Sequence, residues 1–87
     1  MRIWARTFKD NRTVSELVVE NHENDTRTHK VFDAIDQIVT AFDISKPIWL
    51  DLNIKDFKRF SRVRFYKDSF IDEINFDYLE VQVLEED

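Results

Sequence analysis

The fold of this chain is decided by residues 26–42, whose sequence is TRTHKVFDAIDQIVTAF. At about 100° per residue, the apolar side chains of this stretch fall in one continuous arc. The arc consists of Val31, Ala34, Ile35, Ile38, Val39, Ala41 and Phe42, with Phe32 at its edge. A polar residue among 24–26 can cap the first turn, and Pro47 prevents continuation far past Asp43. These features predict a long amphipathic helix over Thr26–Phe42.

The residues before this helix predict a β-hairpin. Arg2–Lys9 and Thr13–Glu20 are two strand-like runs. Asp10 and Asn11 lie between them, where a two-residue loop needs positive φ, and these residue types tolerate it best after glycine. In this register the opposed pairs are Arg2 with Val19, Ile3 with Val18, and Trp4 with Leu17.

The predicted register gives both faces of the hairpin apolar side chains. One face holds Ile3, Ala5, Val14 and Val18, and the other holds Trp4, Phe8, Leu17 and Val19. A single helix can cover only one face, so the second set is a candidate self-association surface, most simply in a twofold homodimer. Arg2, Trp4, Arg6 and Phe8 share one face of the first strand, and tryptophan with arginine is typical of interaction hot spots. The alternative is that Trp4 and Phe8 face the core while Ile3 and Ala5 point outward.

The segment after Pro47 predicts a second, shorter helix. With Asn53 as N-cap, Asp56 falls at the third helical position, and Leu52 and Phe57 take the hydrophobic-staple positions. Lys58 and other cations near the far end suit the helix dipole, and the helix is expected to end near Phe60.

The last third of the chain predicts mainly β structure. Alternation over Arg62–Tyr66 favours a short strand, and Ser69 is expected to cap a single helical turn. Phe76–Glu85 predicts a long strand, with Leu79, Val81 and Val83 on one face and Tyr78, Glu80 and Gln82 on the other. Residues 85–87 are expected to fray.

Together these elements predict an α+β fold in the order β-β-α-α-(β)-β, as a single domain over residues 1–87. The sheet is expected to be small and mainly antiparallel, built from the N-terminal hairpin and the C-terminal strand. The long helix should lie across one face. The second helix and the Arg62–Tyr66 segment should lie at one edge.

The composition excludes several classes of function. The chain has no cysteine, which excludes disulfides and thiolate chemistry, and no glycine, which excludes phosphate loops and dinucleotide fingerprints. Residues 1–6 mix charged with apolar side chains and do not resemble an export signal, and no apolar run has membrane-spanning length. We therefore expect a cytoplasmic protein with no membrane partner.

One segment departs strongly from the acidic average. Residues 55–67 contain six cations and one acid, a net charge of +5 in a chain of net charge −5, so the remainder carries −10. The candidate partner-binding residues here are Lys55, Lys58, Arg59, Arg62, Arg64, Tyr66 and Lys67. Cations interleaved with aromatic rings suit a polyanion such as single-stranded nucleic acid. Neutralisation by acids elsewhere in the chain is the favoured alternative, and an acidic protein partner is a third.

Catalytic chemistry has little support in the sequence. His29, Asp33, Asp36 and Thr40 form a polar stripe opposite the apolar arc of the long helix, which could hold a divalent cation. A surface His–Asp pair four residues apart is equally ordinary on an exposed helix face. We expect no cofactor, no metal and no enzymatic activity. The favoured function is a non-catalytic protein-interaction module or small accessory protein; the alternatives are nucleic-acid binding through residues 55–67 and a small metal-dependent enzyme.

Overall fold

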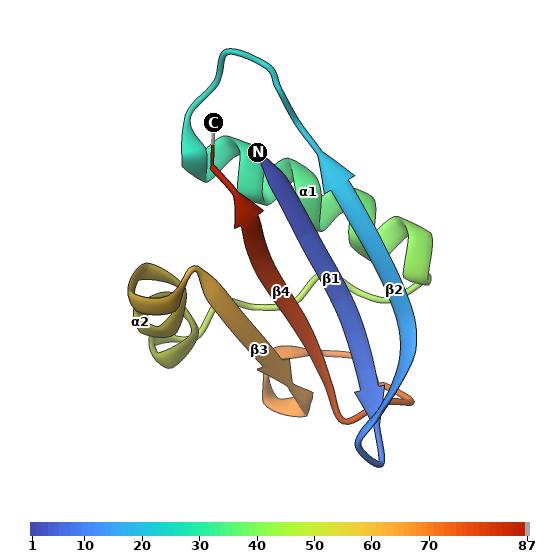
Figure 1. Ribbon diagram of the computed structural model, residues 1–87. Coiled ribbons are helices and arrows are strands. Elements are labelled where there is room, and N and C mark those ends of the chain that lie inside the picture. Colours follow the sequence, from blue (N-terminus) through green and yellow to red (C-terminus); the bar gives the residue numbers. More distant parts are fainter. Residues whose placement is uncertain (87) are drawn as a thin grey trace.

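The computed structural model describes residues 1–86, in which the chain forms one four-stranded antiparallel sheet and two α-helices (Figure 1). The elements are β1 (Arg2–Lys9), β2 (Arg12–Glu20), α1 (Arg27–Phe42), α2 (Asp51–Phe60), β3 (Arg62–Tyr66), the 3₁₀ turn η1 (Lys67–Ser69) and β4 (Tyr78–Glu85). The strand order is β2-β1-β4-β3. The predicted α+β class and element order are confirmed. Glu85 ends β4, whereas Asp87 of the predicted tail lies outside the described residues.

The long helix forms where the apolar arc predicts it. Thr26 is the N-cap, and its hydroxyl accepts a hydrogen bond from the His29 amide at 3.2 Å. The helix buries five members of the arc, which are Val31, Ala34, Ile35, Ile38 and Val39. Asp43 ends it in the left-handed conformation. No helix within residues 1–86 combines the length and apolar character needed to cross a bilayer.

The sheet has one covered and one uncovered side. In Figure 1, α1 lies behind β1 and β2, and α2 lies beside the edge strand β3, as predicted. We call the side that packs against α1 the inner face and the opposite side the outer face. The core lies between the inner face and α1, and its strand residues are Ile3, Ala5, Val19, Val63, Phe65, Leu79 and Val81.

The predicted hairpin register is right at the turn and wrong beyond it. Asp10 and Asn11 both have positive φ, and Lys9 pairs with Arg12 as expected. Between Thr7 and Phe8 a β-bulge shifts the register by one residue. A shift of one residue moves every following side chain of the strand to the other face.

This bulge splits the candidate self-association set. Leu17 lies opposite Ala5 and Val19 opposite Ile3, so both belong to the inner face, where Val19 is buried. Trp4 and Phe8 lie on the outer face, so the four residues do not share one surface. The alternative in which Ile3 and Ala5 point outward is also wrong, because both are buried in the core.

The second helix begins three residues earlier than an Asn53 N-cap requires. Leu50 is the N-cap, so Asn53 is the third residue inside the helix. Its side-chain oxygen accepts a hydrogen bond from the Leu50 amide at 2.9 Å. Leu52 is 67% exposed and does not form the predicted hydrophobic staple with Phe57, which is buried. The helix ends at Phe60 as predicted.

The segment between β3 and β4 also differs from its prediction. The helical turn here is η1, which Ser69 ends rather than caps, and Ile71 is 85% exposed. The last strand begins at Tyr78, two residues later than expected, and its alternation is as predicted: Leu79 and Val81 are fully buried.

Candidate functional site

The outer face of the sheet carries side chains from all four strands. In Figure 1 neither α1 nor α2 crosses it. The strand pairings place side chains on it in rows that run across the sheet. The three central rows are Val18, Trp4, Gln82 and Arg62; Glu16, Arg6, Glu80 and Arg64; and Thr13, Phe8, Tyr78 and Tyr66, in the order β2, β1, β4 and β3.

The middle row alternates in charge. Glu80 is its centre and is only 2% exposed, although it lies on the uncovered side of the sheet. Arg6 donates from Nη2 to one carboxylate oxygen of Glu80, and Arg64 donates from Nε to the other at 3.0 Å. The Glu80 carboxylate raises the pKa of Arg64 above its ordinary value through this hydrogen bond. Two guanidinium groups therefore compensate the buried carboxylate and are held in place by it.

Aromatic rings flank this charged row on both sides. The Arg6 guanidinium lies 3.7 Å from the Trp4 ring centroid and 5.0 Å from that of Phe8. Phe8 stacks on Tyr78, with centroids 4.9 Å apart, and Tyr78 contacts Tyr66 at 5.3 Å. The Trp4 indole also donates to Glu16 at 2.9 Å. These contacts hold the side chains of the charged row and of the neighbouring aromatic residues in place within the chain.

We expect the substitution Glu80→Gln to lower the free energy of unfolding by about 1–3 kcal/mol. The reason is that the glutamine amide has a single acceptor oxygen, so one of the two hydrogen bonds is lost and the other no longer has an anionic acceptor. The loss stays below that of a fully buried ion pair because the Arg6 and Arg64 side chains are 23% and 46% exposed. Urea unfolding measures it. Glu73→Gln, at an exposed position, is the matched control; equal losses in both variants would contradict the role assigned to Glu80.

The cations of the basic segment, residues 55–67, have two kinds of surroundings in the structure. Arg64 is neutralised within the chain by Glu80, as the alternative reading of the segment expected. The remaining cations are exposed, and within residues 1–86 no carboxylate lies within ion-pair distance of them; they are Lys55, Lys58, Arg59, Arg62 and Lys67. Neutralisation inside the chain therefore applies to one cation of the segment.

Part of this segment gathers around an exposed ring where α2 meets β3. Phe60 is 52% exposed, and the guanidinium groups of Arg59 and Arg62 lie 5.2 and 6.0 Å from its centroid. Lys67 lies at the other end of β3, and Tyr66 belongs to the outer face, where it is 51% exposed. Phe57 and Phe65, in contrast, are buried in the core.

The polar stripe of α1 is engaged in ordinary surface pairs. The Nδ1 atom of His29 lies 2.9 Å from Oδ1 of Asp25, and Lys46 lies 2.6 Å from Asp36. The pKa of Asp25 is lowered because its carboxylate accepts a hydrogen bond from the Thr26 amide and, second, contacts His29. Within residues 1–86, no three His, Cys, Asp or Glu side chains are placed to hold a metal ion together.

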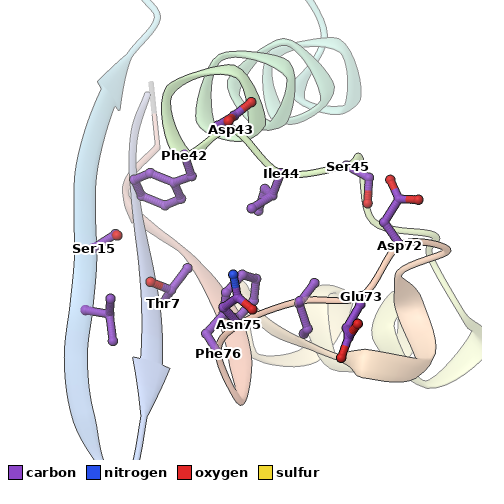
Figure 2. A pocket seen from close by; sticks show the side chains of 12 residues that line it. Thr7, Ser15, Phe42, Asp43, Ile44, Ser45, Asp72, Glu73, Asn75 and Phe76 are labelled. Carbon is purple, nitrogen blue, oxygen red and sulfur yellow. The ribbon is translucent and has the colours of Figure 1, made fainter.

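A cavity of about 400 Å³ lies on the inner side, between the end of α1 and the loop before β4 (Figure 2). Figure 2 shows Phe42, Ile44 and Phe76 around it, with Thr7 and Ser15 on its strand side. The carboxylates of the surrounding acids, Asp43, Asp72 and Glu73, point in different directions rather than toward one point. The cavity therefore has a mixed polar and apolar lining, and its carboxylates do not form a converging set of catalytic groups.

A smaller groove of about 320 Å³ runs between α1 and α2. Trp49 forms its floor and makes edge-to-face contacts with Phe32, Phe57 and Phe65 at 6.3, 5.5 and 5.0 Å. Arg27 lies at the rim, with its guanidinium 4.8 Å from the Phe57 ring. The lining of this groove is mainly apolar, and Arg27 and Lys58 are its charged members.

No protein-family model, curated protein or solved structure matches this chain. Its candidate site must be argued from its own residues. On that basis the outer face is the strongest candidate, because it combines Trp4, Arg6 and Tyr66 on one uncovered surface.

Two of the residues that organise the outer face were missed by sequence reasoning. Glu16 and Glu80 are two of the eighteen acids of the chain, and no local motif distinguishes them from the others. Glu80 differs from the other acids because β4 lies between β1 and β3, so an arginine of each neighbouring strand lies beside its carboxylate. The signal that existed was the alternation over Tyr78–Gln82, which put Glu80 on the face opposite Leu79.

Proposed function

We propose that this chain is a protein-interaction module that binds its partner through the outer face of the sheet. The observation that supports the proposal most is the fixed Trp4–Arg6–Glu80–Arg64 arrangement. Tryptophan, tyrosine and arginine are the residues that dominate binding energy at protein interfaces. Here they are held by cation–π contacts and by a buried carboxylate.

Preorganisation favours a protein partner over stacked bases on this face. Ordering a flexible side chain on binding costs about 0.5–1.5 kcal/mol, and these side chains are already ordered. Base stacking needs an exposed ring face. Arg6 covers a face of the Trp4 ring, and Phe8 and Tyr78 cover each other at an interplanar angle of 24°.

The test compares binding by the wild-type chain, the outer-face variant Trp4→Ala/Tyr66→Ala, and the control Phe32→Ala on α1. Phe32 is 50% exposed, nearly the same as Tyr66, but lies off the outer face. A protein captured from the source cells is purified, and its affinity for each purified variant is measured. We expect the outer-face variant to bind at least about tenfold more weakly and the control to bind like the wild type. Equal binding by all three chains would overturn the proposal.

A second candidate function is polyanion binding at the α2–β3 corner. The observation in its favour is the exposed Phe60 ring between Arg59 and Arg62, with further cations on α2 that have no ion-pair partner within residues 1–86. Fluorescence anisotropy with a labelled single-stranded oligonucleotide tests it. If it is right, affinity falls steeply with salt, by about 0.7 logarithmic units per phosphate contact for each tenfold rise. It also falls in Phe60→Ala. Absence of binding at low salt would end this candidate.

A further inference from the structure

We propose that the outer face binds a second copy of this chain, in a dimer whose twofold axis runs parallel to the strands. This inference rests on the proposed function, because it names the partner of the same surface. Its basis is the order of charges in the middle row, which from β2 to β3 is Glu16, Arg6, Glu80 and Arg64. The row is negative at one end, positive at the other, and alternates between.

The strand order determines what such an axis brings together. Rotation by 180° about an axis between β1 and β4, parallel to the strands, turns the sheet over and exchanges its two edges (Figure 1). The β2 strand of one copy then lies on β3 of the other, and β1 lies on β4. Glu16 then faces the partner's Arg64, so the two exposed ends of the row meet their opposites, while Arg6 lies over the partner's buried Glu80.

The other aligned twofold packing is disfavoured by the same row. An axis that runs across the strands places β2 on β2 and β3 on β3. Glu16 would then face the partner's Glu16, and Arg64 would face the partner's Arg64. Like charges in contact oppose association, so the row selects the axis parallel to the strands.

The neighbouring rows fit the selected axis. Phe8 lies on the partner's Tyr78, so the aromatic pairs of the two copies meet. Arg62 lies on the partner's Val18, which is 41% exposed and is flanked on the same face of β2 by Glu16 and Glu20. Within residues 1–86 of a single copy Arg62 has no carboxylate at ion-pair distance, whereas the dimer supplies two.

The size of the face sets the expected strength of the dimer. At about 3.3 Å per residue and about 4.8 Å between strands, a face eight residues long and four strands wide measures roughly 26 Å by 19 Å, so about 500 Å² is an upper value for a sheet whose edge strand β3 has 5 residues. Standard interfaces bury about 800 Å² on each partner. A dimer on this face alone is therefore expected to dissociate in the micromolar range or above.

Charge exchange between two variants tests the axis directly. Arg62→Glu places a carboxylate against the partner's Glu16, and Glu16→Arg places a guanidinium against the partner's Arg62, so each variant repels itself at two symmetric contacts. Both positions are exposed, and circular dichroism checks that each variant folds. When the two variants are mixed, both contacts between positions 62 and 16 join opposite charges, while the guanidinium introduced at position 16 still faces Arg64 of the other copy. Lys58→Glu is the matched control, because it reverses a charge of the same basic segment away from the outer face.

Sedimentation equilibrium from about 5 µM to about 1 mM gives the outcome, a range chosen for a weak interface. We expect the wild type and Lys58→Glu to rise from 10.6 kDa toward twice that mass, each single variant to associate at least about tenfold more weakly, and the mixture to associate more strongly than either single variant. A wild type of 10.6 kDa throughout, or a mixture that stays monomeric, would overturn the dimer. Either result leaves a different protein partner to be judged by the Trp4→Ala/Tyr66→Ala comparison.

Discussion

Replacing Phe65 by alanine is expected to lower the free energy of unfolding by about 3–5 kcal/mol, as for other large-to-alanine changes in cores. Phe65 is 0% exposed and lies on the inner face of β3, where its ring meets Trp49 edge to face at 5.0 Å. The substitution removes this contact and leaves a cavity between β3 and α2. A domain of this size typically has about 4–13 kcal/mol of stability, so the variant should lose much of it.

The matched control is Phe60→Ala, which makes the same chemical change five residues earlier in the same basic segment. Phe60 is 52% exposed, and we expect an effect within about 0.5 kcal/mol. Urea unfolding followed by circular dichroism measures both variants. Similar losses at the two positions would mean that the core does not extend beneath β3 and α2 as described.

The parts of the fold that the sequence predicts are those specified by local periodicity. The apolar arc of α1 needs no knowledge of the rest of the chain, because a helix with one apolar stripe must bury that stripe. The same holds for the alternation of β4 around Leu79 and Val81 and for the positive φ of Asp10 and Asn11. Each of these features follows from neighbouring residues alone.

The assignment of hairpin side chains to the two faces of the sheet could not be predicted, because the bulge in β2 is stabilised by tertiary packing and not by neighbouring residues. The two-residue loop correctly pairs Lys9 with Arg12, but continuing that register would put Leu17 and Val19 on the outer face. The shift of one residue brings them to the inner face, beneath α1, where apolar burial stabilises the fold. This stabilisation depends on α1, which follows later in the chain, so the hairpin sequence alone does not indicate the bulge.

The candidate site could be predicted only in part, because some of its contacts join residues that are far apart in the sequence. The grouping of Trp4 with Arg6 on one side of a strand follows from alternation, and both lie on the outer face. The carboxylate that fixes Arg6 comes from Glu80, which is 74 residues away in sequence. Likewise, the basic segment was visible in the sequence, but only the pairing of β3 with β4 separates Arg64 from the cations that stay exposed.

The substitution Asn53→Ala is expected to lower the free energy of unfolding by about 2–4 kcal/mol, because Asn53 joins three parts of the structure. Its side chain accepts hydrogen bonds from the Leu50 amide at 2.9 Å and the Ser69 hydroxyl at 3.3 Å. It also donates to the Arg64 carbonyl at 3.1 Å, on the free edge of β3. Each such bond contributes about 0.5–1.5 kcal/mol, and Asn53 is only 7% exposed, so water does not readily replace them.

Glycine at the same position distinguishes the two roles considered for Asn53. At an N-cap, glycine costs only a few tenths of a kcal/mol and is milder than alanine. Inside a helix, glycine is worse than alanine by about 1 kcal/mol. Because α2 begins at Asp51, we expect Asn53→Gly to be the less stable of the two variants in urea unfolding. Asn24→Ala is the control, since the Asn24 side chain is exposed and makes no hydrogen bond within residues 1–86. A glycine variant more stable than the alanine variant would return Asn53 to the N-cap and α2 to a start beyond it.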